Sequence, residues 1–295
     1  MACAAFIATS AWSIHAHAQQ APTIDVSIAD AAVIATAAAG AFALSRLPVT
    51  PSGWQDEPFS FDEGTRGVLS TTHSRIADVL LLSSIVAPVA VGAARDDDER
   101  APKLVVYAES LAVAGLLNGL AKYVVQRPRP HSYGTSPEAT AYTESRGADA
   151  YLSFFSGHAT LAFTSAVAGS YLYAYGNTDT TSRAILWGVE MALASATATE
   201  RVRAGKHFPS DVVVGAAVGT SIGLLVPRAH MSDRSDVSMS VGEWVAIGSG
   251  LVVGTTTSLL LPPLRSDGAT AGGVEMSLTP TFAAGGAGIS ASGRF

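Results

Sequence analysis

Six apolar stretches of about 17–22 residues dominate this chain, and each has the length at which a single helix spans a bilayer. They cover residues 30–47, 76–94, 104–125, 158–175, 183–199 and 211–227. Ala, Gly, Ser and Thr dilute several of them, which is typical of tightly packed membrane helices but also of a buried soluble bundle. We favour membrane helices. The pattern predicts an all-α bundle of about six helices, embedded in a membrane.

The composition excludes several classes of protein. Hydrophobic residues make up 48% of the 295 residues and charged residues only 14%, too few for a disordered chain or a coiled coil. A net charge of −6 does not favour nucleic acid as a partner. Cys3 is the single cysteine, which excludes a disulfide framework, a cysteine zinc site and an iron–sulfur cluster.

The N-terminal residues resemble a secretory signal. Residues 4–14 are apolar, and Ala16-His17-Ala18 has the small-x-small form of a cleavage site, although no Lys or Arg precedes Arg46. We expect export, the alternative being an apolar N-terminal helix. The expected parts of the chain are a signal-like segment (1–18), an N-terminal helix with a connecting loop (19–75), a core (76–230), and a C-terminal apolar segment with a Gly/Ala-rich tail (231–295).

Two cations flank the end of the third stretch. Pro128 and Pro130 end the helix, so Lys122 lies in its last turn and Arg129 just beyond it. A separation of seven residues is two helical turns, so both side chains can point to one side. Taken alone, the pair is also typical of a cationic helix end.

Ser156-Gly157-His158 opens the fourth stretch. Ser is a good N-cap, Gly lets backbone N–H groups approach an anion closely, and a helix N-terminus binds phosphate. His158 then lies at the mouth of such a site. By itself this tripeptide is equally an ordinary capped helix start.

A third polar cluster follows the fifth stretch. His207 and Asp211 are four residues apart, so a helix there brings them into contact. A carboxylate on one ring nitrogen fixes the tautomer and leaves the other nitrogen free as a nucleophile or base. Metal ligation is the competing interpretation, but no HExxH helix or acidic cluster completes a site.

Together the three clusters offer three cations, hydrogen-bond donors and two histidines, which suit a phosphoryl group. They resemble the signature K-x6-RP, PSGH and SR-x5-H-x3-D of the type 2 phosphatidic acid phosphatase (PAP2) superfamily. Lys122–Pro130 matches the first part fully, and Ser156-Gly157-His158 matches three of four positions in the second. Arg201, His207 and Asp211 match the third in type and spacing. The resemblance covers residues 76–227 and does not cover the tail.

Two residues depart from the family pattern. Phe155 replaces Pro, a change that concerns turn rigidity more than chemistry. Glu200 replaces Ser, and a carboxylate beside a phosphate site is unfavourable unless it is paired. Its expected partners are Arg201, Arg203 or Lys206, and it is expected to tune substrate choice.

The resemblance implies a phosphatase that requires no metal or cofactor. In it, His207 attacks phosphorus to give a phosphohistidine, Asp211 orients the ring, and His158 protonates the leaving alcohol and then activates water. The remaining residues hold the phosphate oxygens: Lys122, Arg129, Ser156, Gly157 and Arg201. The apolar flanks favour a lipid phosphate, such as phosphatidate or a polyprenyl diphosphate, as substrate.

Three other functions remain open. A soluble periplasmic acid phosphatase of the same superfamily suits the signal-like start. A vanadate-dependent haloperoxidase has a similar site, because vanadate mimics the phosphorylated transition state. A non-enzymatic membrane protein is compatible with Glu200 and the tail.

The membrane topology contains a conflict. The lipid phosphatases of the superfamily have an extracytoplasmic site, yet cleavage after residue 18 with all stretches spanning places this site in the cytoplasm. The Ala-rich stretch 30–47 is the weakest candidate span, so we expect it not to cross. The tail holds apolar residues at even spacing over 276–282 and 289–295, which predicts either a short β-hairpin or a flexible segment.

Overall fold

The computed structural model describes residues 23–49, 59–95, 97–232 and 237–262, together with the backbone of two strands at 277–283 and 286–292. The signal-like segment 1–18 lies outside the described residues. The elements in chain order are α1 (Ile28–Arg46), the 3-10 turn η1 (Ser60–Thr65), α2 (Thr71–Ala93), α3 (Arg100–Val125), η2 (Pro130–Tyr133), α4 (Pro137–Arg146), η3 (Gly147–Tyr151), α5 (Gly157–Ala174), α6 (Thr180–Arg203), α7 (Pro209–His230), α8 (Val241–Leu260), β1 (Ser277–Ala283) and β2 (Gly286–Ser292).

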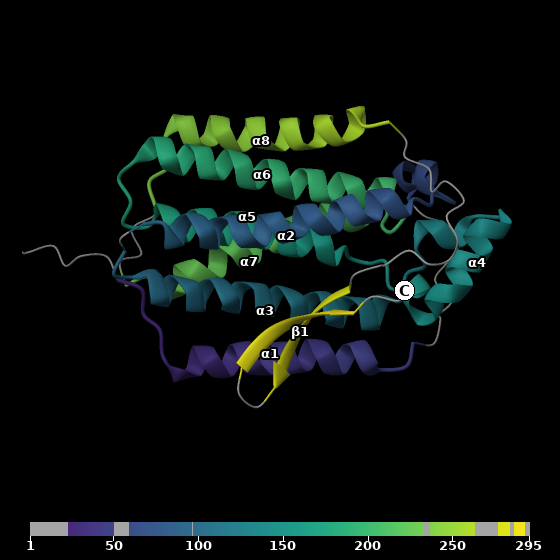
Figure 1. Cartoon of the computed structure of the whole chain (residues 1–295), viewed down its shortest axis with the longest axis horizontal. Coiled ribbons are helices and arrows are strands. Elements are labelled where there is room, and N and C mark those ends of the chain that lie inside the picture. The colour runs from purple at the N-terminus through teal and green to yellow at the C-terminus, as the bar shows by residue number, and fades with distance from the viewer. Residues whose placement is uncertain are drawn as a thin grey trace, which may run out of the picture.

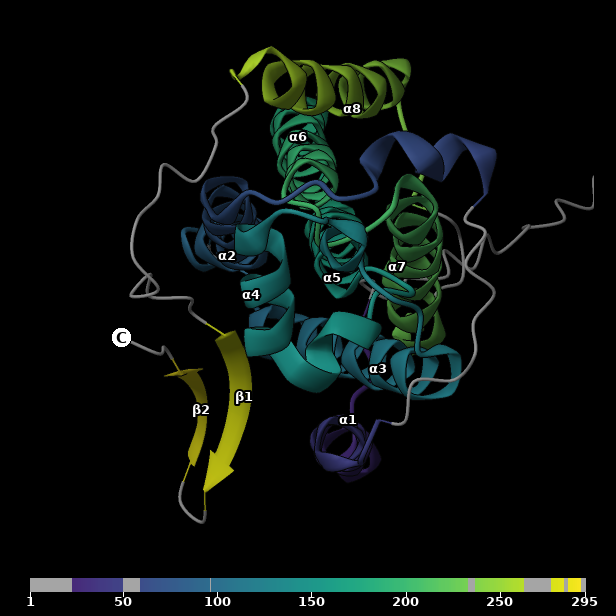
Figure 2. The ribbon, with the colours of Figure 1, turned by 90° about the vertical axis from the view of Figure 1, so that its right-hand side faces the viewer.

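The long helices run side by side along the long axis, from α8 and α6 through α5, α2 and α7 to α3 and α1 (Figure 1). Each of the six predicted apolar stretches forms the body of one helix, and residues 241–260 form the additional helix α8. The expected all-α bundle is therefore confirmed. The short helix α4 lies across one end of the bundle (Figure 2), and the polar segment 131–153 folds there as η2, α4 and η3.

Polar side chains set where the helices begin. Ser27, Ser70, Ser156 and Ser240 each accept a hydrogen bond from a backbone N–H in the first turn of α1, α2, α5 and α8, and Asp179 does so for α6. These caps satisfy N–H groups that a helix leaves without partners. With the cap at Ser70, α2 starts at Thr71, five residues before the apolar stretch 76–94.

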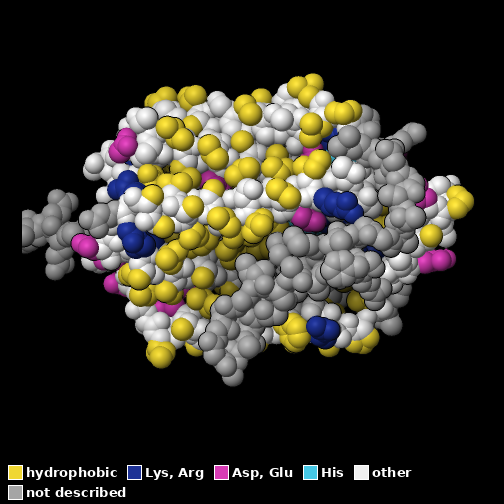
Figure 3. Space-filling model, viewed as in Figure 1, with side chains coloured by type: hydrophobic (Ala, Val, Ile, Leu, Met, Phe, Trp, Pro, Cys, Tyr) yellow, Lys and Arg dark blue, Asp and Glu magenta, His cyan; other side chains and the backbone are white. Residues whose placement is uncertain are grey.

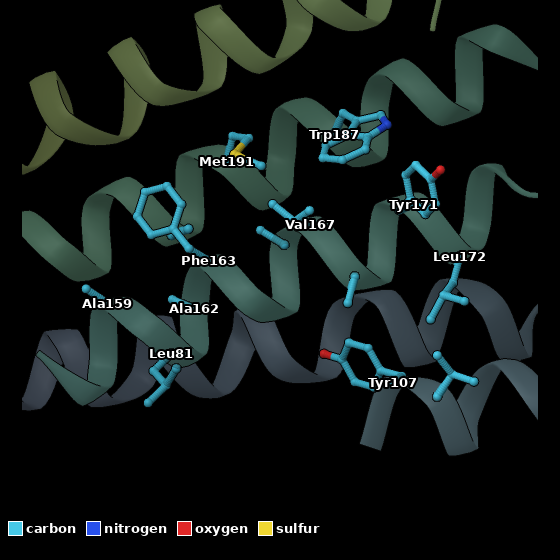
Figure 4. Close-up of a cluster of buried hydrophobic side chains, with 14 of the residues drawn as sticks. Leu81, Tyr107, Ala159, Ala162, Phe163, Val167, Tyr171, Leu172, Trp187 and Met191 are labelled. Carbon is cyan, nitrogen blue, oxygen red and sulfur yellow. The ribbon is translucent and has the colours of Figure 1, made fainter. Parts of the chain in front are cut away.

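Helix α5 is the centre of the bundle. Its apolar side chains pack between α6 on one side and α2 and α3 on the other, as Figure 4 shows for Phe163 and Val167 beside Met191. Leu81 of α2 and Tyr107 of α3 close the other side of this cluster. The burial of α5 places Ser156, at its first turn, in the interior of one end of the bundle.

Helix α7 packs on α5 through glycine. Gly215, Gly219 and Gly223 follow one another at four-residue spacing, and a Cβ at Gly219 would overlap the Thr160 carbonyl. Small residues at this spacing let two helix backbones approach closely. The start of α7 is therefore held against the start of α5, and Asp211 comes next to Ser156.

The outer surface of the bundle is apolar. Large hydrophobic side chains are exposed along its helices, for example Val79 and Val86 of α2 and Val252 of α8. Figure 3 shows them across the middle of one face, with the visible charged side chains mainly toward the two ends.

Four helices among the described residues are long and apolar enough to cross a membrane: Ile28–Arg46, Thr71–Ala93, Arg100–Tyr133 and Pro209–His230. The first of them is the stretch that we expected not to span. By length and composition it is a candidate span like the others.

Of the two structures predicted for the C-terminal tail, the described strands form the β-hairpin. Strands β1 and β2 pair antiparallel, with Ser277 opposite Ser292 and Ala283 opposite Gly286.

Candidate active site

The three sequence clusters meet at the end of the bundle that carries α4. The first comes from the end of α3, the second from the start of α5, and the third from the end of α6 and the start of α7. His207 is close enough to the charges of Lys122, Arg129, Arg201 and His158 for each of them to affect its pKa. The structure thus brings both predicted histidines and all three predicted phosphate-binding cations together.

His207 is almost fully buried, and its hydrogen bonds define one tautomer. Nδ1 lies 2.7 Å from the Ser153 carbonyl oxygen, which can only accept, so Nδ1 carries the proton. Nε2 is then the atom with the lone pair, and it lies 3.3 Å from Nη1 of Arg129. Burial, followed by the neighbouring cations, holds the pKa of His207 well below its usual range. A neutral ring whose Nε2 carries the lone pair is the form that can attack phosphorus.

Asp211 acts on this ring less directly than predicted. Its Oδ2 is 3.8 Å from Nδ1 of His207 and accepts hydrogen bonds from Ser153 Oγ at 2.6 Å and the Phe208 backbone N–H at 2.9 Å. The prediction assumed that both residues lie on one helix, but α7 begins only at Pro209. Asp211 therefore positions Ser153, whose carbonyl in turn orients His207.

Arg127 and Asp62 complete the support of Asp211, and the sequence analysis assigned neither. Nη1 of Arg127 donates to Asp211 Oδ1 at 2.6 Å, and its Nη2 donates to Asp62 Oδ2 at 2.8 Å. Asp62 also accepts from the backbone N–H and the hydroxyl of Ser210. These buried groups anchor η1 to the start of α7.

Arg129 is held in place by backbone and carboxylate acceptors. It donates to the Lys206 carbonyl oxygen at 2.9 Å and, through Nη2, to Asp149 Oδ1 at 2.8 Å. Burial alone would raise the pKa of Asp149, but Arg129 and Arg146 outweigh it and hold this pKa well below the usual range. Asp149 is thus a carboxylate at neutral pH, and it fixes the guanidinium beside His207.

Lys122 makes no hydrogen bond or ion pair within the part of the chain that the structure describes, although it faces Arg129 and Arg201. Three cations at one place favour the binding of an anion there. The first turn of α5 adds donors, since the N–H groups of Gly157 and His158 have no acceptor within the helix. A Cβ at position 157 would lie 2.7 Å from Asn118 Oδ1, so glycine is also required by packing against α3.

Helix α2 supplies partners that the sequence did not reveal. Asp78 Oδ1 lies 2.7 Å from His158 Nε2 and 3.6 Å from Arg201 Nη1, while Ser74 Oγ accepts from Arg201 at 3.1 Å. Burial and then Arg201 lower the pKa of His158 to about 4, against the opposing effect of Asp78. A bound phosphate would favour the protonated ring, because it offsets the surrounding cations.

The two departures from the family pattern have different settings. Glu200 is fully buried, and its Oε2 lies 2.5 Å from Nδ1 of His73, a partner that was not among those expected. Of the expected partners, Arg203 reaches Oε1 only at 4.0 Å. The Phe155 carbonyl oxygen accepts from the Asn118 amide at 2.7 Å, which links the start of α5 to α3.

No curated protein and no solved structure gave a significant match to the chain. The family model of the PAP2 superfamily matches residues 103–234. This segment includes every predicted site residue, from Lys122 to Asp211. PAP2 proteins include phosphatases that act on lipid phosphates. The resemblance that the sequence signature indicates is thus confirmed over residues 103–234.

Proposed function

We propose that this protein is a metal-independent phosphatase that hydrolyses a phosphomonoester or diphosphate through a phosphohistidine. The observation that supports this most strongly is the neutral His207, whose Nε2 carries the lone pair and lies beside Lys122, Arg129 and Arg201. A nucleophile next to preorganised positive charge suits attack on a phosphoryl group, where catalysis is mostly positioning and charge stabilisation.

The reaction has two steps. In the first, Nε2 of His207 forms a bond to phosphorus, the bond to the leaving oxygen breaks, and His158 gives that oxygen a proton. In the second, His158 takes a proton from water, the water oxygen bonds to phosphorus, and the phosphorus–nitrogen bond breaks. Inorganic phosphate leaves, and both histidines return to their starting states.

The cations and the first turn of α5 hold the phosphate through both steps. Lys122, Arg129 and Arg201 balance charge on the nonbridging oxygens, the role that Mg²⁺ plays in kinases. The hydroxyl of Ser156 and the N–H of Gly157 add hydrogen bonds. Asp78 hydrogen-bonds Nε2 of His158, so the ring can return to the same orientation after each proton transfer.

A lipid substrate is favoured over a soluble one by the surface around the site. Asp78 and His158, near the starts of α2 and α5, remain partly exposed. The exposed large apolar residues of α2 begin at the next position, Val79. A lipid chain can stay in the bilayer along such a surface while its phosphate reaches His207.

The substrate class is tested with the purified full chain in detergent, with and without EDTA. We expect release of phosphate from phosphatidate or a polyprenyl diphosphate, unchanged by EDTA. Turnover restricted to soluble sugar phosphates, or activity that EDTA removes and Mg²⁺ restores, would contradict the proposal.

We also propose that the site faces the extracytoplasmic side of a bacterial membrane. Helix α1 starts at the end of the bundle opposite to the site (Figure 1), so this orientation places residue 27 in the cytoplasm and leaves residues 1–18 uncleaved. In a Cys3→Ser background, a cysteine at exposed Glu138 should react with an impermeant maleimide on intact cells. A cysteine that replaces Asp98 should not react. The reverse labelling pattern would show that the topology is the opposite of the one proposed.

A further inference from the structure

We propose that Asp30, Glu109 and His230 bind one divalent transition-metal ion of the zinc class, at the end of the bundle opposite to the active site. The three side chains come from the start of α1, the first half of α3 and the end of α7. Helix α7 runs from the catalytic cluster to His230, a length of about 33 Å for its 22 residues. The site is therefore separate from the phosphatase machinery.

Packing brings the three residues together. The segment before α1 bonds to the end of α7, since the Asp25 N–H donates to the His230 carbonyl oxygen at 2.8 Å. Asp30 Oδ2 caps the N-terminus of α1 by accepting from the Ser27 N–H, and its Oδ1 is left to face His230. The site thus lies where the N-terminal helix is fastened to the PAP2 core.

The hydrogen bond of His230 Nδ1 orients the ring so that Nε2 faces the two carboxylates. Its Nδ1 lies 2.8 Å from the Val226 carbonyl oxygen and so carries a proton. In the neutral ring Nε2 then holds a lone pair, and it lies 3.2 Å from Asp30 Oδ1 and 3.2 Å from Glu109 Oε2. A histidine that ligates a metal typically donates its other N–H to a carbonyl or carboxylate in this way.

A second observation points into the same space. Glu109 is nine-tenths buried, and among the described residues its Oε2 has no hydrogen-bond partner, although it points at His230. The three ligand atoms all lie within 4.8 Å of one another. Nitrogen and oxygen ligands at about 2.1 Å from one zinc ion are themselves about 3.0–3.4 Å apart, which matches the two distances from Nε2.

Charge and accessibility agree with a divalent ion. A protonated His230 balances only one of the two negative charges of Asp30 and Glu109. A divalent cation bound to the neutral ring balances both. One imidazole and two carboxylates form a donor set that suits zinc and its neighbours in the first transition row, with water in the remaining position. Asp30 and His230 keep 15% and 13% of their side-chain surface exposed, so an ion can enter from the aqueous end.

The test uses the purified full chain in detergent, stripped with a chelator and titrated with Zn²⁺ against a competing chelator. We expect one equivalent of bound zinc by elemental analysis, and a loss of affinity of at least about tenfold in Glu109→Gln and in His230→Gln. The matched control is Asp25→Asn, which removes an exposed carboxylate next to the site and should leave zinc binding unchanged. Binding that is equal in all four proteins, or absent in the wild type, would overturn the proposal.

Two measurements keep the proposal testable if the variants do not fold. Co²⁺ added to the wild-type protein should give the visible absorption of a low-coordinate nitrogen and oxygen site, and Zn²⁺ should abolish it. His207→Ala should keep this signal. A missing signal, or one that disappears with His207→Ala, would place the metal elsewhere and refute the assignment.

Discussion

Replacing Asp78 by Asn should slow the hydrolysis of substrates with poor leaving groups much more than that of substrates with good leaving groups. The carboxylate lies 2.7 Å from His158 Nε2 and is the group that opposes the lowering of the His158 pKa to about 4. Loss of an opposite charge at this distance should reduce the protonated fraction of His158 about 10- to 100-fold. An alkyl phosphate needs the proton on its leaving oxygen, so its turnover should fall by about the same factor.

The assay compares an alkyl phosphate with 4-nitrophenyl phosphate over a range of pH. The aryl leaving group needs little protonation, so its kcat/KM, which reports the first step, should change less than about threefold. Since a lower His158 pKa confines the protonated ring to more acid pH, the descending limb of kcat/KM for the alkyl substrate should move to lower pH. The aryl profile should not move.

The matched control is Ser74→Ala. Ser74 Oγ accepts a hydrogen bond from Arg201 at 3.1 Å and, among the described residues, has none with His158. This variant therefore disturbs Arg201, which lies 3.6 Å from Asp78, without removing a partner of His158. It should weaken alkyl and aryl turnover alike. Equal losses for the two substrates in Asp78→Asn would refute the role of Asp78 as the positioning residue of the general acid.

Three further outcomes are expected. His207→Ala should abolish turnover because the nucleophile is lost, whereas Asp211→Asn should retain a residual rate in the same steady-state assay, since Asp211 acts through Ser153. Glu200→Gln should lower the free energy of unfolding by about 2 kcal/mol, seen as a lower melting temperature, because it weakens a buried bond to His73. The double variant His73→Ala, Glu200→Ser should recover part of the lost stability. A wild-type melting temperature in Glu200→Gln would contradict the stabilising role of this bond. Truncation after Arg265 should leave the specific activity intact, and a folded but inactive product would show that the tail completes the site.

The helices and the main site residues could be predicted because their signals are local. The length of each apolar stretch, the serine caps and the prolines after α3 mark the helices within a few residues. Lys122, Arg129, Ser156 and His207 lie at helix boundaries, at spacings that can be read along the chain. Such features depend on neighbours in sequence, and the structure preserves them.

The partners of the candidate catalytic groups could not be predicted, because they come from distant parts of the chain. Asp78 is 80 residues before His158, and His73 is 127 residues before Glu200. Asp78 and His73 both belong to α2, which carries no part of the family signature. The hydrogen bond from His207 to the Ser153 carbonyl oxygen has no sequence signal at all, since every residue has a carbonyl.

Trapping of the covalent intermediate tests the central claim most directly. A radiolabelled aryl phosphate is mixed with His158→Ala, in which the good leaving group permits the first step while the second, which needs His158 to activate water, is slow. The protein should retain the label in a bond that is stable to base and labile to acid, as a phosphohistidine is, and the label should map to His207. Adding His207→Ala to this background should remove the label. Absence of label, or an acid-stable bond at another residue, would contradict the mechanism proposed for this protein.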